Sequence, residues 1–345
     1  MSSEQEIMIT PEEDTFTEEQ PQQTSSAIML PVSSACAKAQ TLLHYIYVTE
    51  DDDSRQDLYE LIQQFAAQPQ QPGDANDFHN FSVVLAQRNE YVYACTVLDC
   101  GLRLFPKNVD LLADYLQYGT RCNQLDACKK YYKTLLKIPR RRWTWRGFAF
   151  LMEYLLFLMD RSDSAKELDA KEQELVSIAT DFRKQFPYTE EPYRSESNVY
   201  RMLNLPDQEA AVLRLALENV RIAPKCALRY ADILFERGLY SEAAAAVHRA
   251  IHDANQTQAS VNEGYVYYLN ALCKIALAQQ AETDLHLDEE AVRSIYSDFN
   301  IALAKFQKTQ SSYTEVIRTK TNTLVNKTGI AVDPSYELLY EYVSE

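Results

Sequence analysis

The residues whose types most clearly suggest chemistry are the basic side chains between Arg121 and Arg146. This segment holds nine basic residues and a single acid, Asp126, in a chain whose overall formal charge is −16. A dense group of cations is suited to binding anions, either an acidic peptide or RNA. The basic residues are Arg121, Lys129, Lys130, Lys133, Lys137, Arg140, Arg141, Arg142 and Arg146.

Two parts of this segment differ in their expected role. Three of the lysines recur at every fourth residue and therefore lie on one stripe of a helix, which is typical of a solvated outer face. Arg140 to Arg142 are followed directly by Trp143, whose indole could stack on a base or lie against an arginine. Trp145 is instead predicted to belong to the core. The arginines with Trp143 are therefore either an anion site or ordinary surface, and both interpretations stay open.

The sequence shows no pattern that indicates catalysis or a metal site. His248 and His252 lie four residues apart on a predicted helix, but no third ligand type is near them, so we expect no metal. The glycine-rich phosphate loops and the nucleophile motif G-x-S-x-G do not occur. We predict that the chain is not an enzyme and takes no cofactor.

Composition and charge restrict the partners and the compartment. With 34 Lys and Arg against 50 Asp and Glu, the whole surface is unsuited to nucleic acid or anionic lipid. The N-terminus does not resemble a secretory signal, and the longest apolar run, 148–159, is too short to span a bilayer. Seven cysteines without a C-x-x-C pair indicate reduced, buried thiols. We expect a cytoplasmic protein without membrane contact.

The elements that position these residues are predicted to be helix pairs. Glycine is scarce, with 7 residues, and the apolar residues follow the helical period of 3.6. One pattern, the repeat template, recurs along the chain: an aromatic or bulky residue is followed by small and apolar residues at helical spacing. We call the first residue of each copy its anchor, and successive anchors are 34, 33, 48 and 34 residues apart. The longer step fits an extended second helix over 164–186. The anchors are Phe78, Leu112, Trp145, Tyr193 and Ala227.

Composition also divides the chain. Residues 1–30 carry seven acids and no base and are predicted to be a disordered acidic tail. A helix pair is expected over 31–67, and the Gln- and Pro-rich stretch 68–77 is predicted to be a linker. The repeats are expected over 78–260. Further helices over 261–345 are predicted to continue or cap them.

Three segments carry a resemblance to a known family. ADILFERGLYSEAAAAVHRAI at 231–251 resembles a tetratricopeptide repeat (TPR), and FPKNVDLLADYL and YKTLLKIPRRRWTW resemble its repeat junctions. The resemblance covers roughly residues 76–255. It implies an all-α fold, a right-handed α-α superhelical solenoid of helix hairpins, whose first helices line a concave groove. Grooves of this kind bind a peptide or helix of a partner.

The same resemblance implies candidate residues in the groove. Arg194 and Asn198 would take the Lys and Asn places of a clamp for a peptide carboxylate, and Lys225 and Arg229 the Lys and Arg places of a later helix. In the family an intervening repeat separates these two helices, which are adjacent here. The alternative is a more general basic groove, in which Asp232 pairs with Arg229 when no partner is bound. Its residues are Arg146, Arg194, Arg201, Lys225 and Arg229.

The sequence therefore predicts a non-catalytic interaction scaffold or adaptor. Its partner is expected to be another protein or peptide, for example one with an acidic segment, held in the concave groove. Two alternatives stay open, a regulatory receptor that senses a peptide and an RNA-associated repeat protein that uses segment 121–146. Nucleic acid is the less expected partner because of the net negative charge.

Overall fold

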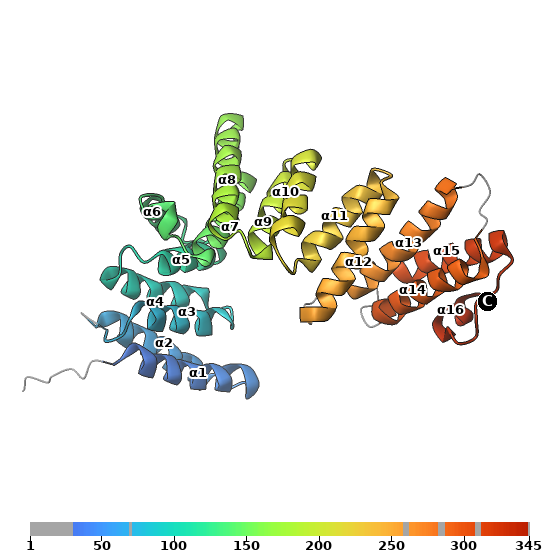
Figure 1. Cartoon of the computed structure of the whole chain (residues 1–345). Helices are drawn as coiled ribbons and strands as arrows, with labels where there is room; N and C mark the ends of the chain where they lie inside the picture. The colour runs from blue at the N-terminus through green and yellow to red at the C-terminus, as the bar shows by residue number, and fades with distance from the viewer. Residues whose placement is uncertain (1–29, 69–70, 258–261, 282–286, 308–311, 344–345) are drawn as a thin grey trace, which may run out of the picture. The chain divides into compact units, whose positions relative to one another are not determined.

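The chain folds into helices alone over the residues that the structure describes. The computed structural model describes residues 30–68, 71–257, 262–281, 287–307 and 312–343 (Figure 1). Over these residues it has sixteen α-helices, one short 3-10 helix and no strand, which confirms the predicted all-α class. Residues 1–29, where the acidic tail is predicted, lie outside the described residues.

The first compact unit ends at Gly73 and contains two helices, α1 (Val32–Val48) and α2 (Asp53–Ala67), which pack against each other. Their facing side chains are fully buried, among them Leu43 and Phe65. Gln71, within the predicted linker, is buried, and its side-chain amide donates to the carbonyl oxygen of Phe65 at 2.7 Å.

The second compact unit begins at Asp74, and its first helix, α3 (Ala75–Ala86), begins three residues before the predicted start of the repeats. The Asp74 carboxylate accepts the N–H of Asp77 at 3.0 Å, and Asp77 accepts the N–H of Asp74 at 2.9 Å. This capping box begins the helix. Composition alone assigns these acids to the linker, because Asp and Asn are common in both linkers and helix caps.

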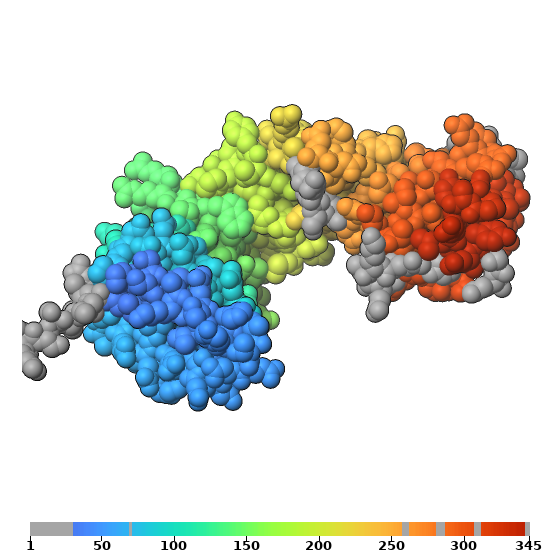
Figure 2. Space-filling view, turned by 90° about the horizontal axis from the view of Figure 1, so that it is seen from below, coloured from blue at the N-terminus to red at the C-terminus, as the bar shows by residue number. Residues whose placement is uncertain are grey.

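The remaining helices of the second unit follow in chain order (Figure 1), and most consecutive helices pack against each other. Figure 2 shows one face of the molecule with the same colouring along the chain. The row continues from α12 into α13, beyond the region that resembles the TPR family. The helices are α4 (Tyr91–Leu104), α5 (Val109–Arg121), α6 (Leu125–Leu136), η1 (Arg140–Arg142), α7 (Trp145–Asp160), α8 (Ala165–Gln185), α9 (Glu190–Met202), α10 (Pro206–Asn219), α11 (Pro224–Glu236), α12 (Tyr240–Thr257), α13 (Glu263–Ala281), α14 (Glu289–Gln307), α15 (Tyr313–Thr328) and α16 (Glu337–Val343).

The predicted repeat template is buried in its sharpest copies. Phe78 in α3 and Ala231 and Ala243 in the α11–α12 pair are fully buried, as the template requires. Small residues permit close approach: a Cβ added at Gly101 of α4 would lie 2.9 Å from the Cβ of Phe78. These helix hairpins confirm the predicted TPR-like architecture of consecutive pairs.

The template is wrong at Trp145, and the neighbouring Trp143 is the tryptophan that packs inward. Trp145 is 42% exposed, whereas Trp143 is only 2% exposed and donates its indole N–H to the carbonyl oxygen of Ile138 at 3.0 Å. The cause is the cap of α7, where the Thr144 hydroxyl accepts the N–H of Gly147 at 3.1 Å. Trp145 is the first residue of α7 and stays partly exposed at the edge of the core, where its ring contacts Phe182, while the preceding Trp143 packs inward against Phe148.

The predicted extended helix is present as α8, which has 21 residues. Only its second half is buried in the core, beginning at Leu175. There the ring of Phe182 stacks on Phe148 of α7, with centroids 5.1 Å apart. The first half of α8 contributes no fully buried side chain.

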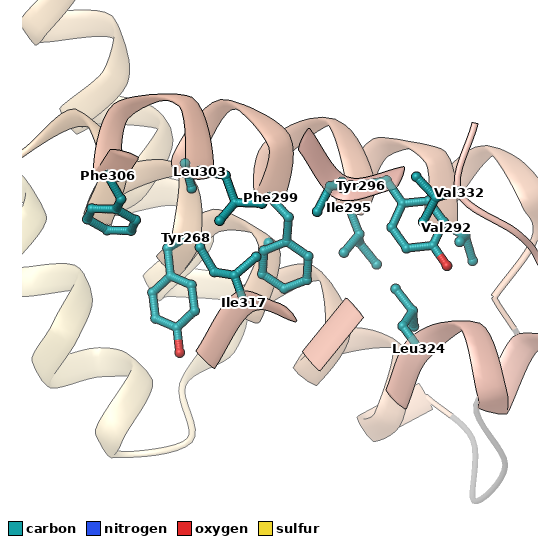
Figure 3. Packing of buried hydrophobic residues seen from close by; sticks show 13 residues of the cluster. Tyr268, Val292, Ile295, Tyr296, Phe299, Leu303, Phe306, Ile317, Leu324 and Val332 are labelled. Carbon is teal, nitrogen blue, oxygen red and sulfur yellow. The ribbon is translucent and has the colours of Figure 1, made fainter. Parts of the chain in front are cut away.

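The C-terminal helices α13 to α16 share an apolar core of their own, shown in Figure 3. Tyr268 of α13 faces Phe299 of α14, with ring centroids 6.3 Å apart, and Ile317 and Leu324 of α15 complete the cluster. The Tyr296 hydroxyl donates to the carbonyl oxygen of Ile330 at 2.8 Å, which secures the segment that leads to α16.

All seven cysteines are free thiols, and five of them are buried, as predicted. The closest pair is Cys95 and Cys122, with sulfur atoms 3.7 Å apart. Within the described chain, no helix combines the length and the apolar character needed to cross a membrane.

Candidate partner-binding surfaces

Three of the four predicted groove arginines already have carboxylate partners within the chain. Arg194 of α9 pairs with Glu191 at 2.5 Å. Arg229 of α11 donates from Nε to Glu209 of α10 at 2.8 Å, and this hydrogen bond raises the pKa of Arg229. Asp232 lies 3.9 Å from Arg229, which confirms the predicted pair but makes it the weaker contact.

An internal carboxylate also lies beside Arg194 and Lys225. Glu190 accepts the N–H of Cys226 at 2.8 Å, at the start of α11. Burial raises the pKa of Glu190, while this hydrogen bond and the positive charges of Arg194 and Lys225 oppose the rise. The chain therefore supplies its own anion where the clamp would hold a peptide carboxylate.

Arg146 balances a buried acid as well. The Asp114 side chain of α5 is fully buried, with His79 Nδ1 2.6 Å from its Oδ2 and Arg146 Nε 3.6 Å from its Oδ1. Burial raises the pKa of Asp114, and the contacts with His79 and Arg146 act against that rise. Arg201, the most exposed member of the predicted groove set, donates to Asn198 Oδ1 at 3.0 Å. The structure thus distributes these cations over separate internal partners.

The lysines of α6 differ from the groove arginines. We define the α6 basic face as Lys129 and Lys133 of α6, Lys137 directly after its last turn, and Arg142 of the following 3-10 turn. All four are exposed, and within the described residues none of them forms an ion pair. The predicted stripe is therefore present. It does more than cover an outer face, because its members line two cavities.

The larger cavity, which we call the α6–α8 cleft, has a volume of about 650 Å³ and lies between α6, the C-terminal end of α7 and the N-terminal half of α8. It exists because α6 and α7 both pack on α5 but make little backbone contact with each other in the described chain (Figure 1). Six side chains define its chemistry: Lys129, Tyr132, Lys133, Tyr154, Phe157 and Arg161.

Aromatic rings form one wall of the α6–α8 cleft. The Tyr132 and Tyr154 centroids are 5.4 Å apart, and Tyr154 and Phe157 stack at 6.3 Å. The Arg161 guanidinium lies over the Phe157 ring at 3.8 Å from the centroid. Burial raises the pKa of Tyr154 to about 12, so the hydroxyl stays neutral at ordinary pH.

The acids of the cleft are engaged by neighbouring groups. The Tyr132 hydroxyl donates to Glu174 Oε2 at 2.7 Å, and Lys171 lies 3.9 Å from Glu167. Lys129 and Lys133 are left without a carboxylate partner among the described residues. The cleft therefore combines an apolar aromatic wall with a cationic rim.

A second cavity, of about 500 Å³, lies at the opposite end of α6. It is lined by three cations, Lys107, Lys137 and Arg142, and by one acid, Asp110. Asp110 accepts the hydroxyl of Thr144 at 2.5 Å. The two cavities place unpaired positive charge at both ends of the α6 basic face.

Of the predicted set Arg140 to Arg142 with Trp143, the structure leaves only part available for binding. Arg140 is bound to Asp181 of α8 and donates to Ser177 at 2.9 Å. Trp143 is buried and cannot stack on a base, whereas the alternative contact with an arginine is present, since the Arg140 guanidinium lies 6.0 Å from the centroid of its ring. Arg141 and Arg142 remain exposed. Sequence reasoning missed Tyr132, which lies between Lys129 and Lys133 in the sequence but about 100° around the helix from Lys133.

The histidine pair is not placed as a metal site. His252 Nδ1 lies 3.2 Å from Asp253 Oδ1. Over the described part of the chain, no group of three or more His, Cys, Asp or Glu side chains is arranged to hold a metal ion.

Comparison with known proteins finds similarity only among solved structures. No protein-family model matches the chain, and no curated protein matches it. A thermophilic TPR protein of Thermus thermophilus, TTC0263, is 19% identical with a TM-score of 0.40, over 59% of this chain and 98% of that one.

Two further solved structures resemble the chain at lower identity. The human IFIT1 dimer with m7Gppp-AAAA is 11% identical with a TM-score of 0.44, over 80% of this chain and 62% of that one. The TPR2AB domain of yeast Sti1 in complex with pHSP90 is 14% identical with a TM-score of 0.27, over 90% and 99%. Two of the three are described as TPR structures, the family that the sequence resembles. At these values the similarity carries no conclusion about what this chain binds.

Proposed function

We propose that this chain is a protein-interaction scaffold that binds an acidic segment of a partner protein on the α6 basic face. The observation that supports the proposal is the contrast in charge pairing. Arg194 and Arg229 are neutralised by Glu191 and Glu209, whereas Lys129 and Lys133 have no acidic partner in the described residues. An unpaired cation contributes more to binding an anion than one that must first leave its own carboxylate.

A protein segment fits this face better than RNA does. RNA carries a charge at every nucleotide and would bring phosphates against Glu167 and Glu174 of the α6–α8 cleft, whereas a peptide can place its carboxylates beside the lysines alone. Trp143, the aromatic residue that an RNA site in this segment would have used for base stacking, is buried. A peptide can place carboxylates beside the lysines and apolar side chains against the aromatic wall.

A synthetic peptide array that varies net charge and apolar content tests the proposal. We expect acidic peptides to be retained and added salt to weaken their binding, because the contacts are between exposed charges. Replacing both Lys129 and Lys133 by Glu should weaken the retained peptides by about tenfold or more, since attraction becomes repulsion.

The matched control reverses two cations of the predicted groove, Arg201 and Lys225, which changes the net charge equally. These substitutions should have little effect. If the groove variant loses the peptides and the α6 variant keeps them, the binding face is wrong and the groove is the site. Binding of single-stranded RNA by a protein that retains no acidic peptide would favour the RNA-associated function instead.

A further inference from the structure

We infer that the α6–α8 cleft receives an aromatic side chain of the acidic partner segment, so that the recognised element is an aromatic residue flanked by carboxylates. This inference rests on the proposed function, because Lys129 and Lys133 belong to both the α6 basic face and the cleft. It goes further by naming what occupies the cavity between the helices.

The size and lining of the cleft fit such a side chain. Its volume of about 650 Å³ is large enough to admit one aromatic side chain together with neighbouring backbone. Aromatic rings prefer offset-stacked or edge-to-face neighbours with centroids about 4.5–7 Å apart. Tyr132, Tyr154 and Phe157 already follow each other at 5.4 and 6.3 Å, and an incoming ring would extend this row.

The rim of the cleft supplies the matching charge. Lys129 and Lys133 lie one helical turn apart on α6, on either side of Tyr132 in the sequence. Arg161 lies across the cleft from them, on the Phe157 ring. Carboxylates on both sides of a bound aromatic residue would meet these cations. Glu174 accepts the Tyr132 hydroxyl and, within the described residues, forms no ion pair with Lys129 or Lys133.

The surrounding helices leave the cleft open to a partner. The side chains of α8 are fully buried only from Leu175 onward, so the ten residues before it are not held by the core on this side. Ala170 in this half is exposed and lines the cleft. A segment that enters here would cover apolar surface that the fold itself leaves uncovered.

Two capped synthetic peptides test the inference: Glu-Glu-Phe-Glu-Glu, with fluorophenylalanine at the centre, and the same peptide with alanine there. We expect the aromatic peptide to bind about tenfold more tightly, and its fluorine NMR signal to shift on binding. The Phe157→Ala variant should remove most of this preference.

A second variant keeps the test decisive if Phe157→Ala disturbs the fold. Ala170→Trp fills the cleft from its exposed side and should block the aromatic peptide while the alanine peptide binds as before. The control is Tyr188→Ala, which removes an aromatic side chain that is 79% exposed and lies outside the cleft. It should leave both affinities unchanged.

The outcomes separate the inference from the proposed function. Equal binding of the two peptides, with dependence on Lys129 and Lys133, would overturn the aromatic pocket and leave the acidic-segment scaffold in place. A preference for the aromatic peptide that survives both Phe157→Ala and Ala170→Trp would place the ring elsewhere and also overturn the inference. If neither peptide binds although the array retains acidic peptides, the inference fails and the proposed function stands.

Discussion

Helices α9 to α12 and helices α6 to α8 belong to the same repeated architecture, but they differ in whether their basic side chains are paired with internal acids. In α9 to α12 several arginines are bound to internal acids, as Arg229 is to Glu209 and Arg249 to Asp253, and the core alanines of α11 and α12 are buried. In α6 to α8 the lysines of the α6 basic face are unpaired within the described chain, and a cleft separates the helices. The lysines that stay unpaired within the described chain therefore lie where internal acids are missing, and not at Arg194 and Arg229, two positions that the family resemblance marks.

The largest expected effect tests whether the paired arginines are structural. Glu209 is only 2% exposed, so Arg229→Gln would leave a buried carboxylate without its cation and should lower the free energy of unfolding by about 2–3 kcal/mol. Lys133→Gln, in the other region, should change it by less than about 0.5 kcal/mol. Urea denaturation of both variants measures the difference, and equal values would remove the contrast between the regions.

The next largest difference between the two regions is expected in the cost of enlarging an alanine side chain. Ala243 is fully buried between α11 and α12, so Ala243→Leu should lower the free energy of unfolding by about 1–3 kcal/mol through overpacking. Ala170→Leu makes the same change on α8, where the cleft has room, and should stay within about 0.5 kcal/mol. A large loss from Ala170→Leu would mean that the cleft is closed in solution.

Acid should remove part of the stability of α9 to α12. Asp253 accepts two hydrogen bonds, from the N–H of Ala223 at 2.9 Å and from Arg249 Nε at 2.7 Å. Burial acts to raise the pKa of Asp253, but these bonds outweigh it and keep the pKa below its usual value of 3.8. Because the pKa of Asp253 is lower in the folded protein than in the unfolded chain, its ionised carboxylate stabilises the fold at pH values above the unfolded-state pKa. This contribution is lost as the pH falls through the folded-state pKa.

Replacing this acid by Asp253→Asn should therefore lower the free energy of unfolding by about 1–2 kcal/mol at neutral pH. The gap from the wild type should close as the pH falls through the lowered pKa. Thermal melts along a pH series measure it, with Asp207→Asn, an 89% exposed acid, as the control for loss of one charge. A gap that is independent of pH would contradict the assignment.

The smallest effect concerns the tryptophans at the start of α7. Trp143→Phe removes the hydrogen bond to the carbonyl oxygen of Ile138 and should lower the free energy of unfolding by about 1 kcal/mol. Trp145→Phe, at an exposed side chain, should stay within about 0.5 kcal/mol. Fluorescence of the single-tryptophan variants checks the same point, since a soluble quencher should reach Trp145 far more readily. Greater quenching of Trp143 than of Trp145 would mean that Trp145 is the buried tryptophan, as the repeat template predicted.

Much of the fold could be predicted because its signals are local. The buried positions of α3, α11 and α12 follow from helical periodicity, and the extended α8 follows from a repeat step of 48 residues. The error at Trp145 shows the limit of this reasoning. Periodicity marks the angle of a residue around its helix, but the cap at Thr144 decides where the helix begins and hence which tryptophan faces inward.

The candidate site was predicted only in part. The excess of basic residues in 121–146 is a property of composition, and it correctly locates the α6 basic face. The aromatic wall was missed because Tyr132 comes from α6 while Tyr154 and Phe157 come from α7, and no local pattern joins them. The groove residues were chosen by resemblance, which does not show the acids that neutralise them.

The sequence by itself determined that this chain is helical, that its helices recur in pairs and that its positive charge is concentrated near the middle, because propensity, periodicity and composition are local properties. The tertiary structure decided which charges are paired and where a cleft opens. Arg140 meets Asp181, Tyr132 meets Glu174 and Arg229 meets Glu209 across separations of 41, 42 and 20 residues. Electrostatic pairing and burial depend on the distances between helices, which helical period alone does not define.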